Sequence, residues 1–122
     1  MWLDPDGLRR FMCPGSTFVA HAEVEPVAGG AFRIEMQVPD GPLLVHSGRY
    51  LEIRRPDRLA FTWVSSATGQ AETRVMLDFY PHPRGCRLDL RHDRLPDQRA
   101  VDRHVGGWTD ILARLEAARP AA

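Results

Sequence analysis

The sequence predicts an α+β fold in which one long C-terminal helix covers an antiparallel sheet of about six strands, with a short helix at the N-terminus. Six successive segments alternate apolar with polar residues, which is the period of a half-buried strand. Residues 48–63 contain two of these segments, joined by a short polar turn. After residue 97 the apolar residues recur every three and four positions, which is the period of a helix.

The N-terminal segment carries the signals of a short helix. Asp4 or Asp6 can cap its first turn, where Pro5 fits because a missing N–H costs little there. We expect this helix to run through Met12 and to end before Pro14, which cannot continue it.

The strands are predicted from alternation and from the turns between them. In the first strand, one face is expected to hold Phe18, Ala20, Ala22 and Val24. The clearest alternation lies in the second strand, and Arg55, Pro56 and Asp57 form the turn of the central hairpin. A small polar loop is expected over residues 66–70. The six predicted strands are residues 17–25, 31–38, 44–54, 59–65, 73–80 and 86–90.

The C-terminal helix is predicted from about Asp97 to Ala118. Its apolar stripe must pack against the sheet, and a cavity forms beneath it if the sheet is curved. Gly106 and Gly107 interrupt it, and each costs about 1 kcal/mol relative to alanine. Close packing on the sheet, or a kink that opens the cavity, would explain the two glycines. The predicted stripe is Val101, Val105, Trp108, Ile111, Leu112, Leu115 and Ala118.

Composition narrows the class of protein. The 122 residues fit one domain, 1–122, and 16 basic residues balance 16 acidic ones. This balance gives no electrostatic reason to expect a nucleic acid or an anionic membrane as a partner. No stretch approaches the ~20 apolar residues that span a bilayer, and no secretory signal is recognisable, so we expect a cytoplasmic protein, of bacterial type. Cys13 and Cys86 are expected to be free thiols.

No motif of cofactor, metal or nucleophilic chemistry is present. The five histidines are dispersed and lack metal-ligand spacing, so no metal site is predicted. No serine lies in a nucleophile elbow, and no glycine-rich loop leads from a strand into a helix. We therefore assign no catalytic residue and no cofactor.

Four motifs carry a resemblance to a known family. They are GGAFRIEM (29–36), GRYLEIRRPDRLAFTW (48–63), RLDLRH (87–92) and GWTDILARL (107–115). In their order and spacing the chain resembles the SRPBCC superfamily, the helix-grip fold of START domains and birch-pollen-allergen proteins. Within it, residues 3–118 are similar to the family named for the activator of heat-shock-protein-90 ATPase.

The resemblance implies a difference at the N-terminus. Family members usually begin with a strand and the start of a helix before the segment that matches residues 2–14, and this chain begins inside that segment. Loss of that strand would leave an unpaired sheet edge, and such edges are often paired with another chain. We therefore expect a homodimer through the exposed edge. A strand encoded upstream of the assigned start would explain the same observation.

The helix-grip resemblance also implies a ligand cavity lined by inward side chains of the sheet and the last helix. An ordinary core would contain the same residues. His92 shares strand parity with Leu88 and Leu90 and could face the mouth of the cavity, or it could be satisfied structurally at the strand end. His46 and Tyr50 share parity on a neighbouring strand and could add a polar rim. The predicted ligand-binding residues are Phe32, Ile34, Met36, Tyr50, Phe61, Trp63, Val75, Leu77, Leu90, His92 and Trp108.

Three functions are compatible with these observations. The first is a small-molecule binding protein that holds a hydrophobic or amphipathic ligand between the sheet and the last helix. The second is an enzyme of the cyclase or hydrolase kind found elsewhere in the superfamily, with His92 as the acid–base candidate. The third is a module that acts on a chaperone, as the family name implies. The sequence favours the first.

Overall fold

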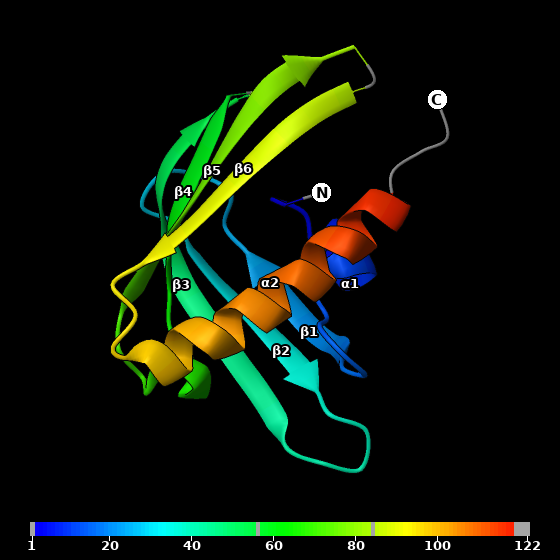
Figure 1. The fold of residues 1–122 in the computed structure, drawn as a ribbon, viewed down its shortest axis with the longest axis vertical. Helices are drawn as coiled ribbons and strands as arrows, with labels where there is room; N and C mark the ends of the chain where they lie inside the picture. Colours follow the sequence, from blue (N-terminus) through cyan, green and yellow to red (C-terminus); the bar gives the residue numbers. More distant parts are fainter. Residues whose placement is uncertain (1, 56, 84, 119–122) are drawn as a thin grey trace.

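The computed structural model describes residues 2–55, 57–83 and 85–118. Six antiparallel strands form one sheet in the order β1-β2-β3-β4-β5-β6, and the long helix α2 crosses its concave side (Figure 1). The predicted helix-grip architecture is confirmed. The elements are α1 (Pro5–Phe11), β1 (Phe18–Val24), β2 (Ala31–Gln37), β3 (Leu43–Arg54), β4 (Arg58–Trp63), the 3-10 turn η1 (Ser66–Thr68), β5 (Thr73–His82), β6 (Gly85–Asp93) and α2 (Gln98–Ala118).

Both helices begin at aspartate caps. The Asp4 carboxylate accepts a hydrogen bond from the Asp6 backbone N–H, which decides between the two predicted caps of α1. The Asp97 carboxylate accepts one from the Ala100 backbone N–H at the start of α2. Further along α2, Asp110 accepts a hydrogen bond from the Gly15 backbone N–H at 3.1 Å. This contact ties α2 to the segment that links α1 with β1.

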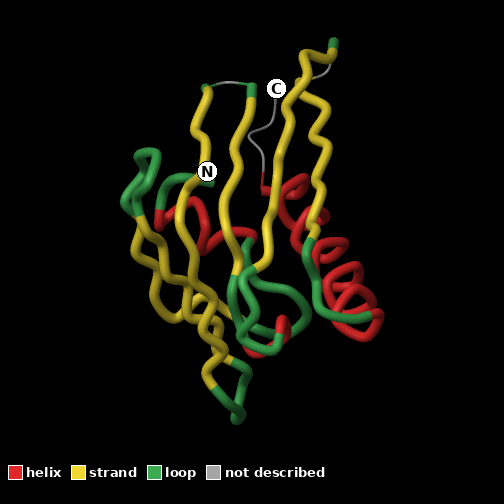
Figure 2. The backbone as a smooth tube through the Cα atoms, turned by 90° about the vertical axis from the view of Figure 1, so that its left-hand side faces the viewer, coloured by secondary structure: helices red, strands yellow, loops and turns green. Residues whose placement is uncertain are grey.

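The sheet bends within β3, which is its longest strand. Residues 43–49 pair with β2, whereas residues 50–54 pair with β4. Gly48 lies at this change of partner, and a Cβ atom added there would be 1.9 Å from the Thr62 carbonyl oxygen and 2.8 Å from the Phe32 ring. Only a residue without a side chain permits so close an approach. β3 ends and β4 begins at the same end of the sheet at which β5 ends and β6 begins (Figure 2).

The core lies between the concave face of the sheet and the two helices. Alternate residues of each strand supply its aromatic and branched side chains. Among them Val75 and Leu77 on β5 are completely buried, as is Phe11 on α1. Both cysteines are free, Cys13 in the core and Cys86 at the surface. None of the helices in the described ranges is long and apolar enough to cross a membrane.

The predicted face of β1 is wrong at its beginning. Phe18 is 51% exposed, and Val19 is buried in its place. The pairing with β2 shifts between Val19 and His21, so Ala20 is an extra residue that reverses the alternation. Ala22 and Val24 point inward as predicted.

The predicted stripe of α2 is wrong at Val105, which is 62% exposed. The buried positions are Ala100, His104, Trp108 and Ile111, one helical face that a histidine shares with apolar residues. Close packing does not explain Gly106 and Gly107, because a Cβ atom at either would meet nothing within 4 Å. The side chain of Ala118 lies outside the described residues.

The loop predicted over residues 66–70 contains an ordered turn. In η1 the Ser65 hydroxyl accepts a hydrogen bond from the Ala67 backbone N–H, and the Thr68 hydroxyl accepts one from the Ser65 N–H. This reciprocal cap satisfies groups that would otherwise be buried without partners. Ala67 is thereby held in a defined position beneath α2.

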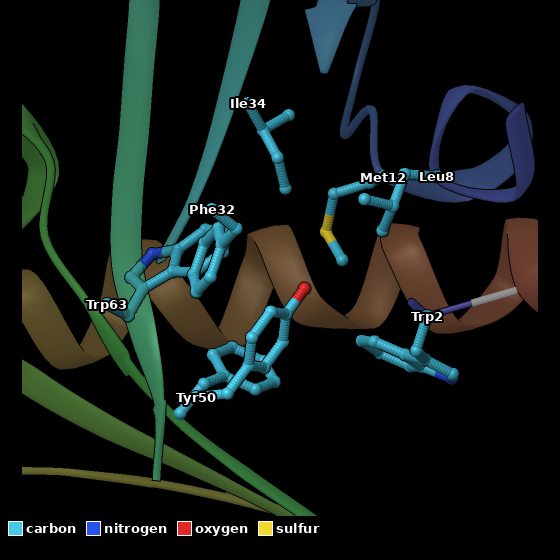
Figure 3. A pocket seen from close by; sticks show the side chains of 8 residues that line it. Trp2, Leu8, Met12, Phe32, Ile34, Tyr50 and Trp63 are labelled. Carbon is cyan, nitrogen blue, oxygen red and sulfur yellow. The ribbon is translucent and has the colours of Figure 1, made fainter. Parts of the chain in front are cut away.

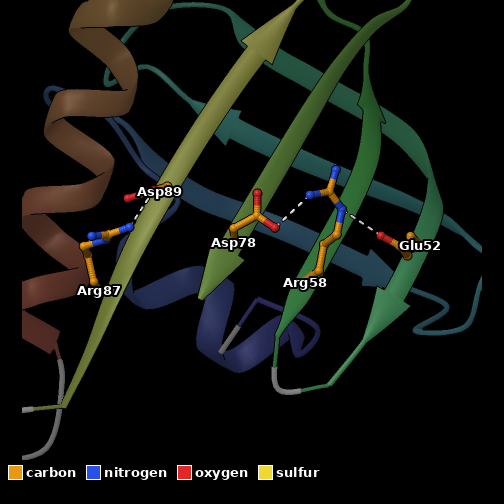
Figure 4. Close-up of polar contacts among 5 residues, drawn as sticks. All are labelled: Glu52, Arg58, Asp78, Arg87 and Asp89. Carbon is orange, nitrogen blue, oxygen red and sulfur yellow. Dashed lines mark hydrogen bonds and ion pairs between the residues drawn. The ribbon is translucent and has the colours of Figure 1, made fainter. Parts of the chain in front are cut away.

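Ion pairs on the outer face of the sheet link neighbouring strands and residues of the same strand. Asp78 pairs with Arg58 at 2.7 Å, and Arg58 also contacts Glu52 at 2.7 Å (Figure 4). Asp89 pairs with Arg87 along β6 at 3.3 Å. Partly exposed pairs of this kind are worth under about 1 kcal/mol each, so they contribute little to the choice of fold.

The sheet ends in β1 on one side and β6 on the other. Dimerisation through an exposed edge stays a prediction. Pro56, in the predicted turn of the central hairpin, lies outside the described residues.

Substitution of Gly48 by alanine tests the bend of β3. Because the added methyl group would meet the backbone of β4, Gly48→Ala should lower the free energy of unfolding by about 3 kcal/mol or more. Gly106→Ala is the control and should raise stability by up to about 1 kcal/mol. Urea denaturation of both variants measures the effect, and a Gly48→Ala protein of wild-type stability would contradict the close approach.

Candidate functional site

The centre of the concave face is a packed aromatic core. Five of the predicted ligand-binding residues line a space of only about 10 Å³ there, room for at most about one water molecule. The Phe32 and Phe61 rings meet edge to face with their centroids 5.4 Å apart. The Tyr50 hydroxyl points toward Met12 (Figure 3). The residues around this space are Trp2, Leu8, Met12, Phe32, Ile34, Tyr50, Phe61 and Trp63.

The remaining predicted site residues lie in the core or around a second space, which Trp63 also lines. Val75 and Leu77 are buried in the core, and Leu90 packs against it. Met36, Trp63 and Trp108 reach a recess of about 160 Å³ beneath α2. An apolar cavity of about this size in another protein holds a benzene ring. The recess is lined by Pro14, Met36, Leu44, His46, Trp63, Ala67, Arg103, His104, Gly107, Trp108 and Ile111.

Two elements bring most of these side chains together. On β3, Leu44 and His46 point to the concave side because they alternate with outward residues, and His46 lies opposite Ile34 of β2. On α2, the residues from Arg103 to Ile111 form one side of the recess because they recur every three or four positions. Gly107 has no side chain, so space remains where another residue would project.

A chain of hydrogen bonds joins α2 to the sheet next to the recess. The Trp108 indole N–H donates to His92 Nδ1 at 3.0 Å, and His92 Nε2 lies 2.7 Å from the Thr73 hydroxyl. That hydroxyl donates to the Trp63 carbonyl oxygen at 2.6 Å. Since indole can only donate and the Thr73 proton is already used, His92 must be neutral with its proton on Nε2. Both ring nitrogens of His92 are therefore engaged within the protein.

His46 and His104 complete a cluster of three histidines. The His92 and His104 rings meet edge to face with centroids 4.7 Å apart, and the His46 ring lies 5.0 Å from that of Trp63. Since His104 Nδ1 is 2.7 Å from the Ala100 carbonyl, Nδ1 carries a proton and donates it. His92 does not line the recess, so its predicted place at a ligand stays a prediction.

The cluster disfavours positive charge. Burial lowers the pKa of His46 to about 4, an effect that the Leu44 carbonyl opposes and the charge of His104 increases. Burial, followed by the charge of His104, also lowers the pKa of His92 to about 4, against the opposing effect of Asp93. Both rings are therefore neutral near pH 7.

Two residues that line the recess each have a buried ring nitrogen without a partner. Among the described residues, His46 Nδ1 and Trp63 Nε1 are the buried side-chain nitrogens without a hydrogen bond. His46 is 9% exposed and Trp63 is 3% exposed. The Trp63 nitrogen lies on the side of the indole away from Tyr50 (Figure 3). A buried polar group without a partner typically costs about 1–3 kcal/mol, so a partner outside the chain would be favourable.

The sequence prediction located part of this site. It named Met36, Trp63 and Trp108, and strand parity brought His46 to the concave side. His46 and Tyr50 do not form a common rim, because Tyr50 lines the packed centre instead. The prediction missed Arg103 and His104. The spacing of Ala100, His104 and Trp108 is that of one helical face, but a polar residue such as histidine was not counted in the apolar pattern.

Two further features were considered as sites. No group of three His, Cys, Asp or Glu residues within the described ranges is arranged to hold a metal ion. A space of about 190 Å³ also opens beside Trp2, Leu3 and Arg54. The described residues around it have no buried side-chain nitrogen or oxygen without a partner. The recess beneath α2 is therefore the better candidate.

Comparison with known proteins agrees with this architecture. The family model described as "Activator of Hsp90 ATPase homolog 1-like protein" matches residues 1–119. The chain belongs to this family. No curated protein sequence matches it.

Solved structures from three bacteria have the same fold as this chain. Protein CV1439 from Chromobacterium violaceum has a TM-score of 0.83 at 24% identity, over 95% of this chain and 82% of that one. Protein NE0264 from Nitrosomonas europaea has a TM-score of 0.78 at 25% identity, over 95% and 80%. An AHSA1-like protein from Aeromonas hydrophila has a TM-score of 0.77 at 23% identity, over 95% and 77%.

The lowered pKa values of His46 and His92 predict that acid destabilises the fold. Between about pH 6.5 and 4 the unfolded chain binds protons that the folded histidines do not, so stability falls as the pH falls. In His46→Phe this slope should decrease by up to about 1.4 kcal/mol per pH unit. Urea midpoints across this range measure it, with exposed His21→Gln as control. An unchanged slope in His46→Phe would contradict the prediction.

The two tryptophans at the recess should respond differently to phenylalanine. Trp108→Phe removes the donor to His92, whereas Trp63→Phe removes an N–H that has no partner among the described residues. The free energy of unfolding should therefore fall by about 1–2 kcal/mol more in Trp108→Phe. Chemical denaturation of both variants gives the difference. Equal losses would show that the Trp108–His92 hydrogen bond contributes little.

Proposed function

We propose that the protein binds a small apolar or amphipathic molecule in the recess beneath α2. The observation that carries this proposal is the combination of an apolar space of about 160 Å³ with two unpartnered buried nitrogens among its described lining residues. Protein interiors are usually filled to high density and their buried polar groups usually have partners. A ligand would supply the missing contacts of both kinds.

The neighbouring parts of the structure support a preformed site. The Trp108 hydrogen bond to His92 holds one side, and the reciprocal cap of η1 holds Ala67 on another. The aromatic core next to the recess has little free space, which favours binding at this end of the sheet. A site whose lining is already ordered loses less conformational entropy when it binds a ligand.

No observation on the described residues favours either alternative function. An enzyme would need an acid–base group free to reach a substrate, and both nitrogens of His92 are engaged in the chain from Trp108 to Thr73. A chaperone partner is suggested by the family's name. The expectation of a bacterial, cytoplasmic protein stays a prediction.

The two adjacent glycines of α2 provide a matched test of binding. Gly107 lines the recess, whereas Gly106 is exposed and does not line it. Gly107→Leu should place its side chain in the recess and weaken the binding of single-ring compounds at least about tenfold. Gly106→Leu should bind them as the wild type does. Both variants should be at least as stable as the wild type, because leucine favours helix over glycine.

The measurement uses a panel of neutral, cationic and anionic single-ring compounds, followed through the indole N–H resonances of Trp63 and Trp108. Native mass spectrometry of freshly purified protein adds a search for a retained ligand. If no compound shifts either resonance, or if both leucine variants bind equally well, the recess is not a binding site.

A further inference from the structure

The recess has a basic lining residue and no acidic one among the described residues. Its titratable lining residues are His46 from β3 and Arg103 and His104 from α2, and no aspartate or glutamate lines it. The lining residue from β2 is Met36, that from η1 is Ala67, and that from the segment between α1 and β1 is Pro14. None of these side chains ionises. Of the three titratable groups, arginine is charged at every physiological pH.

The carboxylates nearest in sequence to Arg103 are Asp97, Asp102 and Asp110, and each has another partner. Asp97 accepts a hydrogen bond from the Ala100 backbone N–H. Asp102 accepts a hydrogen bond from the Gln98 side chain at 2.8 Å, and Asp110 accepts one from the Gly15 backbone. None of the ion pairs found among the described residues includes Arg103. An exposed guanidinium at the edge of an apolar recess is therefore available to a ligand.

The unpartnered nitrogens restrict the ligand further. Indole N–H can only donate a hydrogen bond, so the missing partner of Trp63 must be an acceptor. The guanidinium of Arg103 also offers only donors, and its planar fork matches the two oxygens of a carboxylate. A ligand that carries a donor-rich or cationic head group would leave both residues unsatisfied.

Resting on the proposed function, we infer that the ligand is a small hydrophobic carboxylate, with one ring or a chain of similar bulk in the recess and its anionic group toward Arg103. The apolar side chains of Met36, Leu44 and Ile111 contact the body of the ligand. The size of the recess limits the buried part to about one ring.

Three probes of nearly equal size separate charge from shape: benzoate, benzamide and benzyl alcohol. They are titrated into the full chain at pH 7, with the Trp63 and Trp108 indole resonances assigned through the two phenylalanine variants. Benzoate should bind at least about tenfold more tightly than benzamide. Arg103→Gln should abolish this preference, whereas Arg99→Gln, one turn earlier on α2 and outside the recess, should retain it.

Each outcome of these titrations either supports or overturns the carboxylate inference. Equal affinity for benzoate and benzamide, or equal effects of the two arginine substitutions, overturns the carboxylate inference while a binding recess remains. Failure of all three probes to shift either resonance up to their solubility overturns both the inference and the proposed function. Circular dichroism verifies that the exposed substitutions leave the fold intact.

Discussion

The long helix is held on the sheet by the hydrogen-bond chain that runs from the Trp108 indole through His92 and Thr73 to the Trp63 carbonyl. Each donor in this chain has one acceptor, so the tautomer of His92 and the orientation of both rings are determined together. Apolar packing alone would leave the rotation of the helix about its axis and its distance from the sheet less defined, because hydrophobic contacts are non-directional. The position of α2, and hence the recess beneath it, depends on this polar connection.

The recess lies at one end of the helix–sheet interface because large side chains fill the middle. Phe32, Phe61 and Trp63 pack edge to face or at a tilt where β3 bends, and Gly48 lets the backbones of β3 and β4 approach there. At Gly107 the helix carries no side chain, so the space beneath it is not filled. The same curvature therefore produces a dense core and, beside it, a space that a ring can enter.

The electrostatics of the recess follow from this arrangement. Burial keeps His46 and His92 neutral near pH 7, so these two rings can lie in an apolar interface. Arg103 lies at the exposed edge, and arginine is charged at every physiological pH. The recess thus offers a neutral, mostly apolar interior beside a single permanent positive charge. This combination selects for ligands that have both an apolar body and an acceptor group.

The sequence by itself determined the element order, the start of the C-terminal helix and most inward strand faces, because caps, turns and periodicity are local properties. It also identified Met36, Trp63 and Trp108 as inward residues. The tertiary structure alone decided the bulge at Ala20, the exposure of Val105, the burial of His104 and the partner of Asp78. Each of these depends on which neighbours a residue meets across the sheet or beneath the helix. The recess belongs to the second group, since an empty space arises from how separate elements pack and no single segment encodes it.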